Sequence, residues 1–78
     1  MMKKPMLLTS KILLDSFKKE LYEYHIIDSN DFSYIKYWHA REAISIFEEL
    51  LALDIELASE LSLEYEESLV SMYKYITD

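Results

Sequence analysis

The chain contains no glycine, and this absence restricts its backbone shapes more than any other feature of the sequence. Glycine normally supplies the conformations with φ > 0 that tight hairpin turns and phosphate-cradling loops use. A P-loop and a glycine-rich dinucleotide fingerprint are therefore excluded. The single proline, Pro5, stands where it can open a helix but cannot break one later in the chain.

Strong helix formers make up much of the rest, with Leu, Glu, Ala, Lys and Met all plentiful. Hydrophobic residues account for 51% of the chain, which is too many for a disordered protein. The 78 residues suffice for one domain with a thin core, which a partner chain would help to complete. We therefore expect an all-α fold with more than about 60% helix and no strand.

Three amphipathic segments are expected, at about residues 10–26, 31–53 and 62–77. Apolar residues recur three and four positions apart in each of them. The pattern predicts a small three-helix bundle, completed by self-association or by a partner helix. Residues 1–9 would form an N-terminal segment ahead of a single helical domain at 10–78. The predicted core consists of Leu14, Phe17, Leu21, Phe47, Leu51, Leu69, Met72 and Ile76.

The stretch at residues 54–61 leaves two alternatives open. Nothing in it breaks a helix, so the second and third helices could form one long rod. Asp54, Ser59 or Ser62 could instead cap a bend. We expect the bend, because one long rod would have little to pack its apolar side against.

An aromatic cluster opens the second helix. At ~100° per residue, Tyr34, Tyr37 and Trp38 project over the polar side of this helix. Either residues 32–38 fold back as a loop, or the helix is continuous and presents the cluster on its polar side. The rings could pack under a neighbouring helix, but Trp, Tyr and Arg also dominate protein-binding hot spots. The predicted partner-binding residues are Tyr34, Tyr37, Trp38, Arg41, Glu48 and Glu49.

The formal charge of −7 is unevenly distributed. Residues 1–41 hold seven Lys or Arg against five Asp or Glu, whereas residues 42–78 hold only Lys74 against ten acidic residues. Such an acidic half repels a phosphate backbone and attracts basic surfaces, so we expect no direct nucleic-acid binding. The glutamates also predict a second, acidic face that competes for the binding role. It would comprise Glu48, Glu49, Glu56, Glu60, Glu64 and Glu67.

Residues arranged for catalysis or metal binding are not found in the sequence. His39 and Glu42 lie three apart and share a helix face, but a di-iron bundle needs Glu-x-x-His pairs on two helices. No serine stands in a Gly-x-Ser-x-Gly setting, and no nucleophile, base and oxyanion donor occur together. We therefore expect a protein that is not an enzyme and that uses no cofactor and no metal.

The location of the protein is inferred from cysteine content and from the length of apolar runs. The chain has no cysteine, which fits a reducing compartment. No apolar run approaches the ~20 residues that a membrane-spanning helix needs. We expect a cytoplasmic protein that does not bind membranes.

Two stretches of the C-terminal half carry a resemblance to a known family. They are residues 43–56, AISIFEELLALDIE, and residues 69–76, LVSMYKYI. Both resemble the flagellin-export chaperones (the FliS family), in which a helix ending near EL…LD-x-E leads into one ending in LY-x-Y-[IM]. The segment Ser10–Tyr24 also resembles that family's early amphipathic helix. The family's inter-helix glycines and its last helix have no counterpart here.

This resemblance implies a chaperone that shelters an aggregation-prone, unfolded secretion substrate along apolar grooves. The leading prediction is accordingly a non-catalytic protein-binding module, most specifically a chaperone-like sequestering protein for a secretion or flagellar substrate. It would act as a homo-oligomer or in a hetero-complex.

Two other functions stay open. The first alternative is an acidic inhibitor that blocks a basic nucleic-acid-binding surface of its target, as phage anti-defence proteins and antitoxins do. A structural subunit of a larger assembly is the second. Apolar binding would tolerate salt, whereas a charge mimic would lose affinity steeply as salt rises.

Overall fold

The computed structural model describes residues 7–28 and 32–77, and 90% of these residues are helical. No strand occurs in these two ranges, so the all-α prediction is confirmed. The described residues form four helices where three were predicted. In chain order they are α1 (Leu8–Ile26), α2 (Tyr34–Leu53), α3 (Ile55–Glu64) and α4 (Glu66–Thr77).

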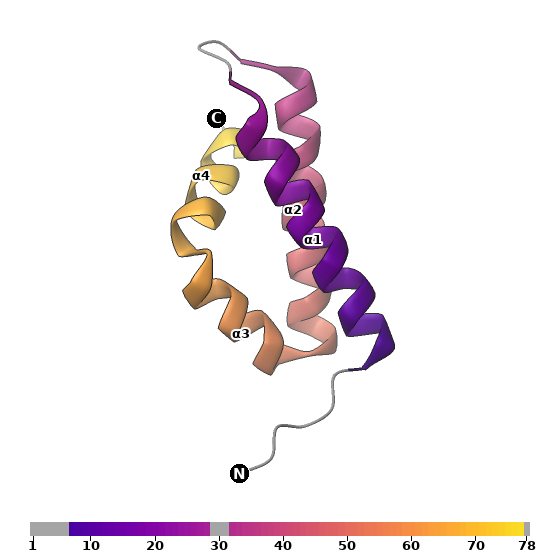
Figure 1. The fold of residues 1–78 in the computed structure, drawn as a ribbon. Coiled ribbons are helices and arrows are strands. Elements are labelled where there is room, and N and C mark those ends of the chain that lie inside the picture. Colours follow the sequence, from indigo (N-terminus) through magenta and orange to yellow (C-terminus); the bar gives the residue numbers. More distant parts are fainter. Residues whose placement is uncertain (1–6, 29–31, 78) are drawn as a thin grey trace.

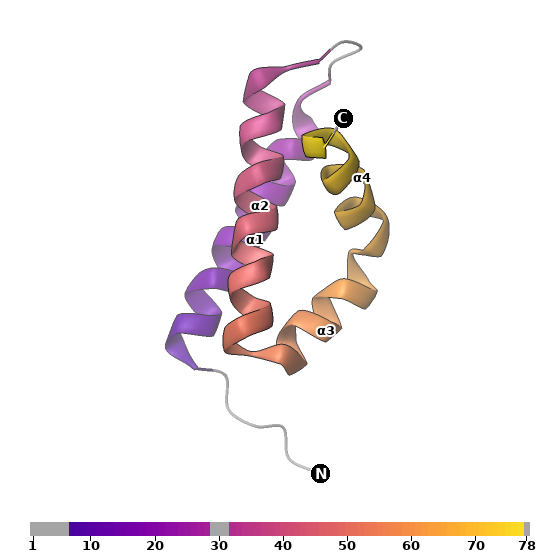
Figure 2. The ribbon, with the colours of Figure 1, turned by 180° about the vertical axis from the view of Figure 1, so that it is seen from behind.

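The helices form an elongated bundle with three arms, as Figures 1 and 2 show. The first arm is α1, the second is α2, and α3 with α4 forms the third. α1 and α2 run antiparallel and side by side. α3 leaves the C-terminal end of α2, and α4 then brings the chain back toward the start of α2. α3 and α4 together therefore occupy the place of the single third helix that the sequence predicted.

The second helix is continuous through the aromatic cluster. The Ser33 side chain caps it by accepting a hydrogen bond from the Lys36 backbone N–H at 3.3 Å, and the helix begins at Tyr34. The alternative in which residues 32–38 fold back as a loop is thus wrong. The predicted start at residue 31 lies outside the described residues.

The predicted bend occurs, but it is confined to Asp54. This residue leaves helical geometry with φ −148° and ψ 83°, and its carboxylate caps α3 by accepting from the Leu57 N–H at 3.3 Å. The hydroxyl of Ser10 donates to the same carboxylate at 3.2 Å. A helix then begins at Ile55, so the expected start of the third helix at residue 62 is wrong.

A second interruption, at Tyr65, was not predicted. Tyr65 has φ −116° and ψ 31°, and it separates α3 from α4. Its ring packs on Phe17 of α1, with the centroids 5.8 Å apart. No glycine or proline marks this position, so the sequence carries no signal for the interruption. It accompanies the packing of the Tyr65 ring on α1.

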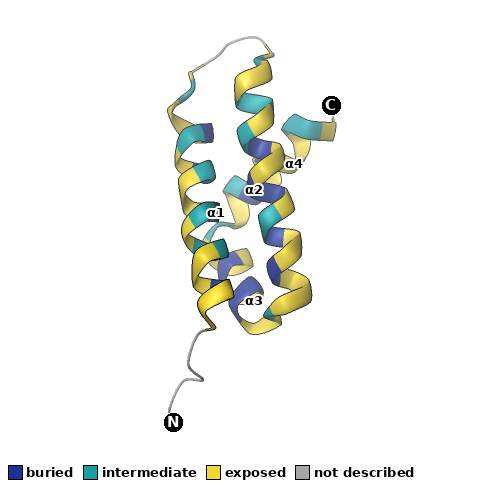
Figure 3. Cartoon of the chain, turned by 90° about the vertical axis from the view of Figure 1, so that its right-hand side faces the viewer, coloured by how far each residue is buried: buried dark blue, intermediate teal, exposed yellow. Residues whose placement is uncertain are grey.

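The core lies where the three arms face one another, and Figure 3 shows the buried positions gathered on those sides. Five of the eight predicted core residues are buried, and Leu14 and Ile76 are partly buried against them. Leu51 was wrongly placed in the core: it is 40% exposed, whereas Leu50 beside it is fully buried. Leu50 shares a helix side with His39, which contacts α1 through Glu20, so α1 covers that side of α2.

The two neighbouring leucines give a matched test of the core. Leu50→Ala should lower the free energy of unfolding by about 2–5 kcal/mol, because it removes a fully buried side chain and leaves a cavity. Leu51→Ala makes the same chemical change on the same helix and should cost about 1 kcal/mol or less. Urea unfolding followed by far-ultraviolet circular dichroism measures both. Equal losses of unfolding free energy in the two variants would contradict the burial of Leu50 and the exposure of Leu51.

Candidate functional site

Four aromatic rings and one guanidinium gather at the start of α2, where Tyr34 is 74% exposed, Phe32 57% and Trp38 55%. Phe32 meets Tyr34 edge to face at 5.1 Å between centroids and lies 5.8 Å from Tyr37. Tyr37 in turn meets Trp38 at 6.4 Å. We call this surface the aromatic patch, and it comprises Phe32, Tyr34, Tyr37, Trp38 and Arg41.

Arg41 closes the patch on its C-terminal side. Its guanidinium carbon lies 6.0 Å from the centre of the Trp38 ring, within the range of a cation–π interaction. Its Nη1 also donates to the Tyr37 hydroxyl at 3.3 Å. The structure therefore brings together four of the six predicted partner-binding residues: Tyr34, Tyr37, Trp38 and Arg41.

Phe32 belongs to the patch but was missed by the sequence prediction. It precedes the cap residue Ser33, and its contact with Tyr37 is that of a hydrophobic staple, in which the residue before the cap packs on the fourth helical residue. An apolar residue directly before a serine cap was the available signal.

The patch is held in place from α1 and α4. Phe32 stacks on Tyr75 of α4 with centroids 5.5 Å apart, and the Tyr75 hydroxyl accepts from the Ser33 backbone N–H at 2.7 Å. The Lys36 ammonium lies 4.7 Å from the centre of the Tyr24 ring in α1 and donates to the Ile27 carbonyl at 3.1 Å. These contacts order the underlying framework while the outer rings stay open to solvent.

An open depression of ≈330 Å³ adjoins the patch between α2 and the end of α4. Arg41 and Glu48 both line it, so Glu48 is part of the same region. Burial raises the pKa of the nearby Tyr73 hydroxyl, and the negative charge of Glu48 raises it further. The lining residues are Tyr37, Arg41, Ile44, Ser45, Glu48, Ile76 and Thr77.

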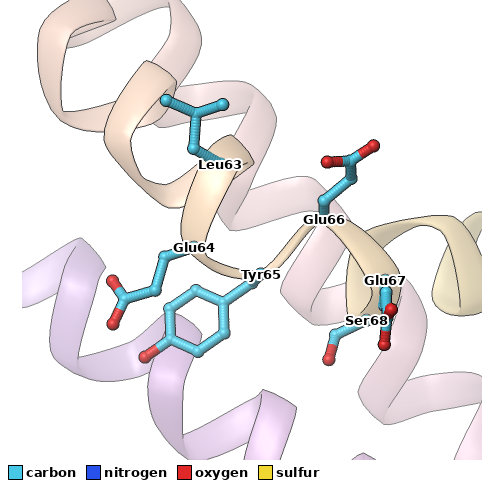
Figure 4. A pocket seen from close by; sticks show the side chains of 6 residues that line it. All are labelled: Leu63, Glu64, Tyr65, Glu66, Glu67 and Ser68. Carbon is cyan, nitrogen blue, oxygen red and sulfur yellow. The ribbon is translucent and has the colours of Figure 1, made fainter.

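The predicted acidic face is divided among several surfaces. Glu49 is exposed on α2 outside the depression, whereas Glu56 and Glu60 are exposed on α3. Figure 4 shows a second depression, ≈340 Å³, at the α3–α4 junction, where Glu64 extends toward α1 and Glu66 points away from it. The glutamates therefore do not form one continuous face.

The two histidines pair across helices. His39 Nδ1 lies 3.1 Å from Glu20 Oε2 of α1, so its partner is not Glu42 on its own helix. His25 Nε2 lies 2.9 Å from the Ser68 hydroxyl. Within residues 7–28 and 32–77 no group of three His, Cys, Asp or Glu side chains could hold a metal ion.

None of the helices in the described part of the chain combines the length and hydropathy of a membrane span. No model of a known protein family matches the chain, and neither a curated protein nor a solved structure matches it. The likeness to flagellin-export chaperones stays an expectation from the residues quoted for it. Function is therefore inferred from the aromatic patch and the depression beside it.

The placement of Glu48 beside α4 can be tested through Tyr73. The pKa of Tyr73 should lie above 10.0, and Glu48→Gln should lower it while burial keeps it raised. Because the raised pKa belongs to the folded state, the stability that Tyr73 contributes is present below pH 10.0 and is lost as the pH rises through that raised value.

The measurement is the tyrosinate absorbance of each protein minus that of its Tyr73→Phe counterpart. Glu49→Gln is the matched control, because Glu49 lies outside the depression and should leave the pKa of Tyr73 unchanged. An unchanged pKa in Glu48→Gln would contradict the packing of α4 against α2 at this point.

Proposed function

We propose that the chain is a non-catalytic protein-binding module that holds its partner on the aromatic patch. The observation that carries this proposal is the exposure of large rings that are already ordered by contacts with one another. Exposed apolar clusters mark interaction sites, and Trp, Tyr and Arg supply most of the energy at such sites. Ordered rings also lose little conformational entropy on binding.

The most specific form of this proposal is a chaperone-like protein that sequesters a secretion or flagellar substrate. Apolar exposure beyond the patch supports it, because Leu8, Ile12, Ile55 and Leu63 are also open to solvent. A protein that shelters unfolded chains needs apolar surface at several places. We place the module in the cytoplasm, as the absence of cysteine suggests, in a homo-oligomer or a hetero-complex.

The acidic inhibitor finds less support. A charge mimic needs many carboxylates on one surface, and the described glutamates are spread over α2, α3 and α4. Exposed charge pairs contribute only ~0–1 kcal/mol each, so dispersed ones give little binding energy. The aromatic patch, by contrast, is a single contiguous surface.

Replacement of Trp38 tests the proposal. Trp38→Ala should weaken the binding of the natural partner by ~2 kcal/mol or more, because it removes the largest ring of the patch. Tyr22→Ala is the matched control, since Tyr22 is an exposed aromatic residue on α1 outside the patch, and it should leave affinity unchanged.

The partner is first purified from the native host, and its affinity for each variant is then measured at low and at high salt. Binding that withstands salt but falls with Trp38→Ala supports an apolar anchor. The proposal fails if Trp38→Ala and Tyr22→Ala bind alike, and the inhibitor gains support if Glu48→Lys with Glu49→Lys alone destroys binding.

A further inference from the structure

The exposed side of α2 extends beyond the aromatic patch. Trp38, Ser45 and Ala52 are exposed and follow one another at seven-residue intervals. Seven residues are close to two helical turns, so the three side chains form a nearly straight row ~21 Å long. An aromatic anchor thus stands at one end of a shallow strip, and the remainder of the strip carries only small side chains.

Carboxylates lie along both edges of this row. Glu42 and Glu49, seven residues apart, lie on one edge, and Glu48 lies on the other. All three are exposed, and no ion pair between described residues engages any of them. Arg41, a cation on this side, already lies over Trp38 and donates to the Tyr37 hydroxyl. The edges of the row therefore present negative charge.

We infer that the partner segment is an amphipathic helix whose apolar stripe carries Lys or Arg along its edges, and that it lies along this side of α2. The inference rests on the proposed function and names the class of partner. Ser45 and Ala52 permit close approach of a second helix axis, and an apolar residue of that helix would pack on Trp38.

Charge complementarity selects this occupant. Lys and Arg can lay their methylene stems along apolar surface while their charged ends reach carboxylates at the edge. Glu42, Glu49 and Glu48 would each meet such a group, which fixes the register of the helix and disfavours acidic partners. Nucleic acid could stack on Trp38 and a lipid could pack on it, as the proposed helix would. Both of these ligands are negatively charged, however, so the same carboxylates repel them.

Trp38 is the only tryptophan of the chain, so its fluorescence reports directly on this surface. The probes are two synthetic amphipathic peptides of about 15 residues, roughly four helical turns. Both carry the same leucine stripe, and all the remaining positions are Lys in one peptide and Glu in the other. The Lys peptide should shift the emission of Trp38 to shorter wavelength in a saturable way, because the indole leaves water. The Glu peptide should leave the emission unchanged.

The carboxylates are tested with a charge-matched pair of double variants. Glu42→Gln with Glu49→Gln should weaken binding of the Lys peptide by about fivefold, the value of two exposed charge pairs. Glu64→Gln with Glu66→Gln removes the same charge from the α3–α4 junction and should leave the affinity unchanged at physiological salt, since distant exposed charges are screened.

Three results would overturn the inference. They are equal binding of the Lys and Glu peptides, no emission shift with either peptide, and equal affinities of the two double variants. The proposed function is decided separately, because it depends on whether Trp38→Ala and Tyr22→Ala differ in binding the natural partner.

Discussion

Asp54 joins three helices at one point. Its carboxylate accepts hydrogen bonds from the first turn of α3 at Leu57 and from the hydroxyl of Ser10 in α1, and its backbone N–H donates to the Leu50 carbonyl at the end of α2. Ser10 is fully buried, so its hydroxyl needs this acceptor. The chain changes direction here without glycine, and every described residue keeps a negative φ. The chain therefore turns from α2 into α3 at a residue whose carboxylate binds both α3 and α1.

The opposite end of the bundle is closed by aromatic residues. Tyr75 of α4 receives the Ser33 N–H and stacks on Phe32, and Tyr24 of α1 has its hydroxyl 2.6 Å from that of Ser71 in α4. The contacts that close the bundle therefore also support the aromatic patch. Loosening α4 would therefore remove the support of Phe32.

The change from the basic to the acidic half of the sequence falls within α2, directly after Arg41 of the aromatic patch. Lys36 and Arg41 lie in the first half of this helix, and Glu42, Glu48 and Glu49 follow. The partner helix that we propose would therefore meet an aromatic anchor at one end and carboxylates along the rest. Such an arrangement would give that helix a preferred direction as well as a preferred charge.

Local patterns in the sequence determined the helical content and the inner sides of α1 and α4. They also offered Asp54 as one of three caps for the bend and placed Tyr34 and Trp38 on the polar side of α2. Periodicity and capping act over a few residues, so a short window contains them. Only the tertiary structure decided the break at Tyr65, the burial of Leu50 in place of Leu51, and the division of the glutamates. Each of these three features depends on which other helix packs on a given side of α2, α3 or α4. Such packing joins segments far apart in the chain, so no short window of sequence contains it.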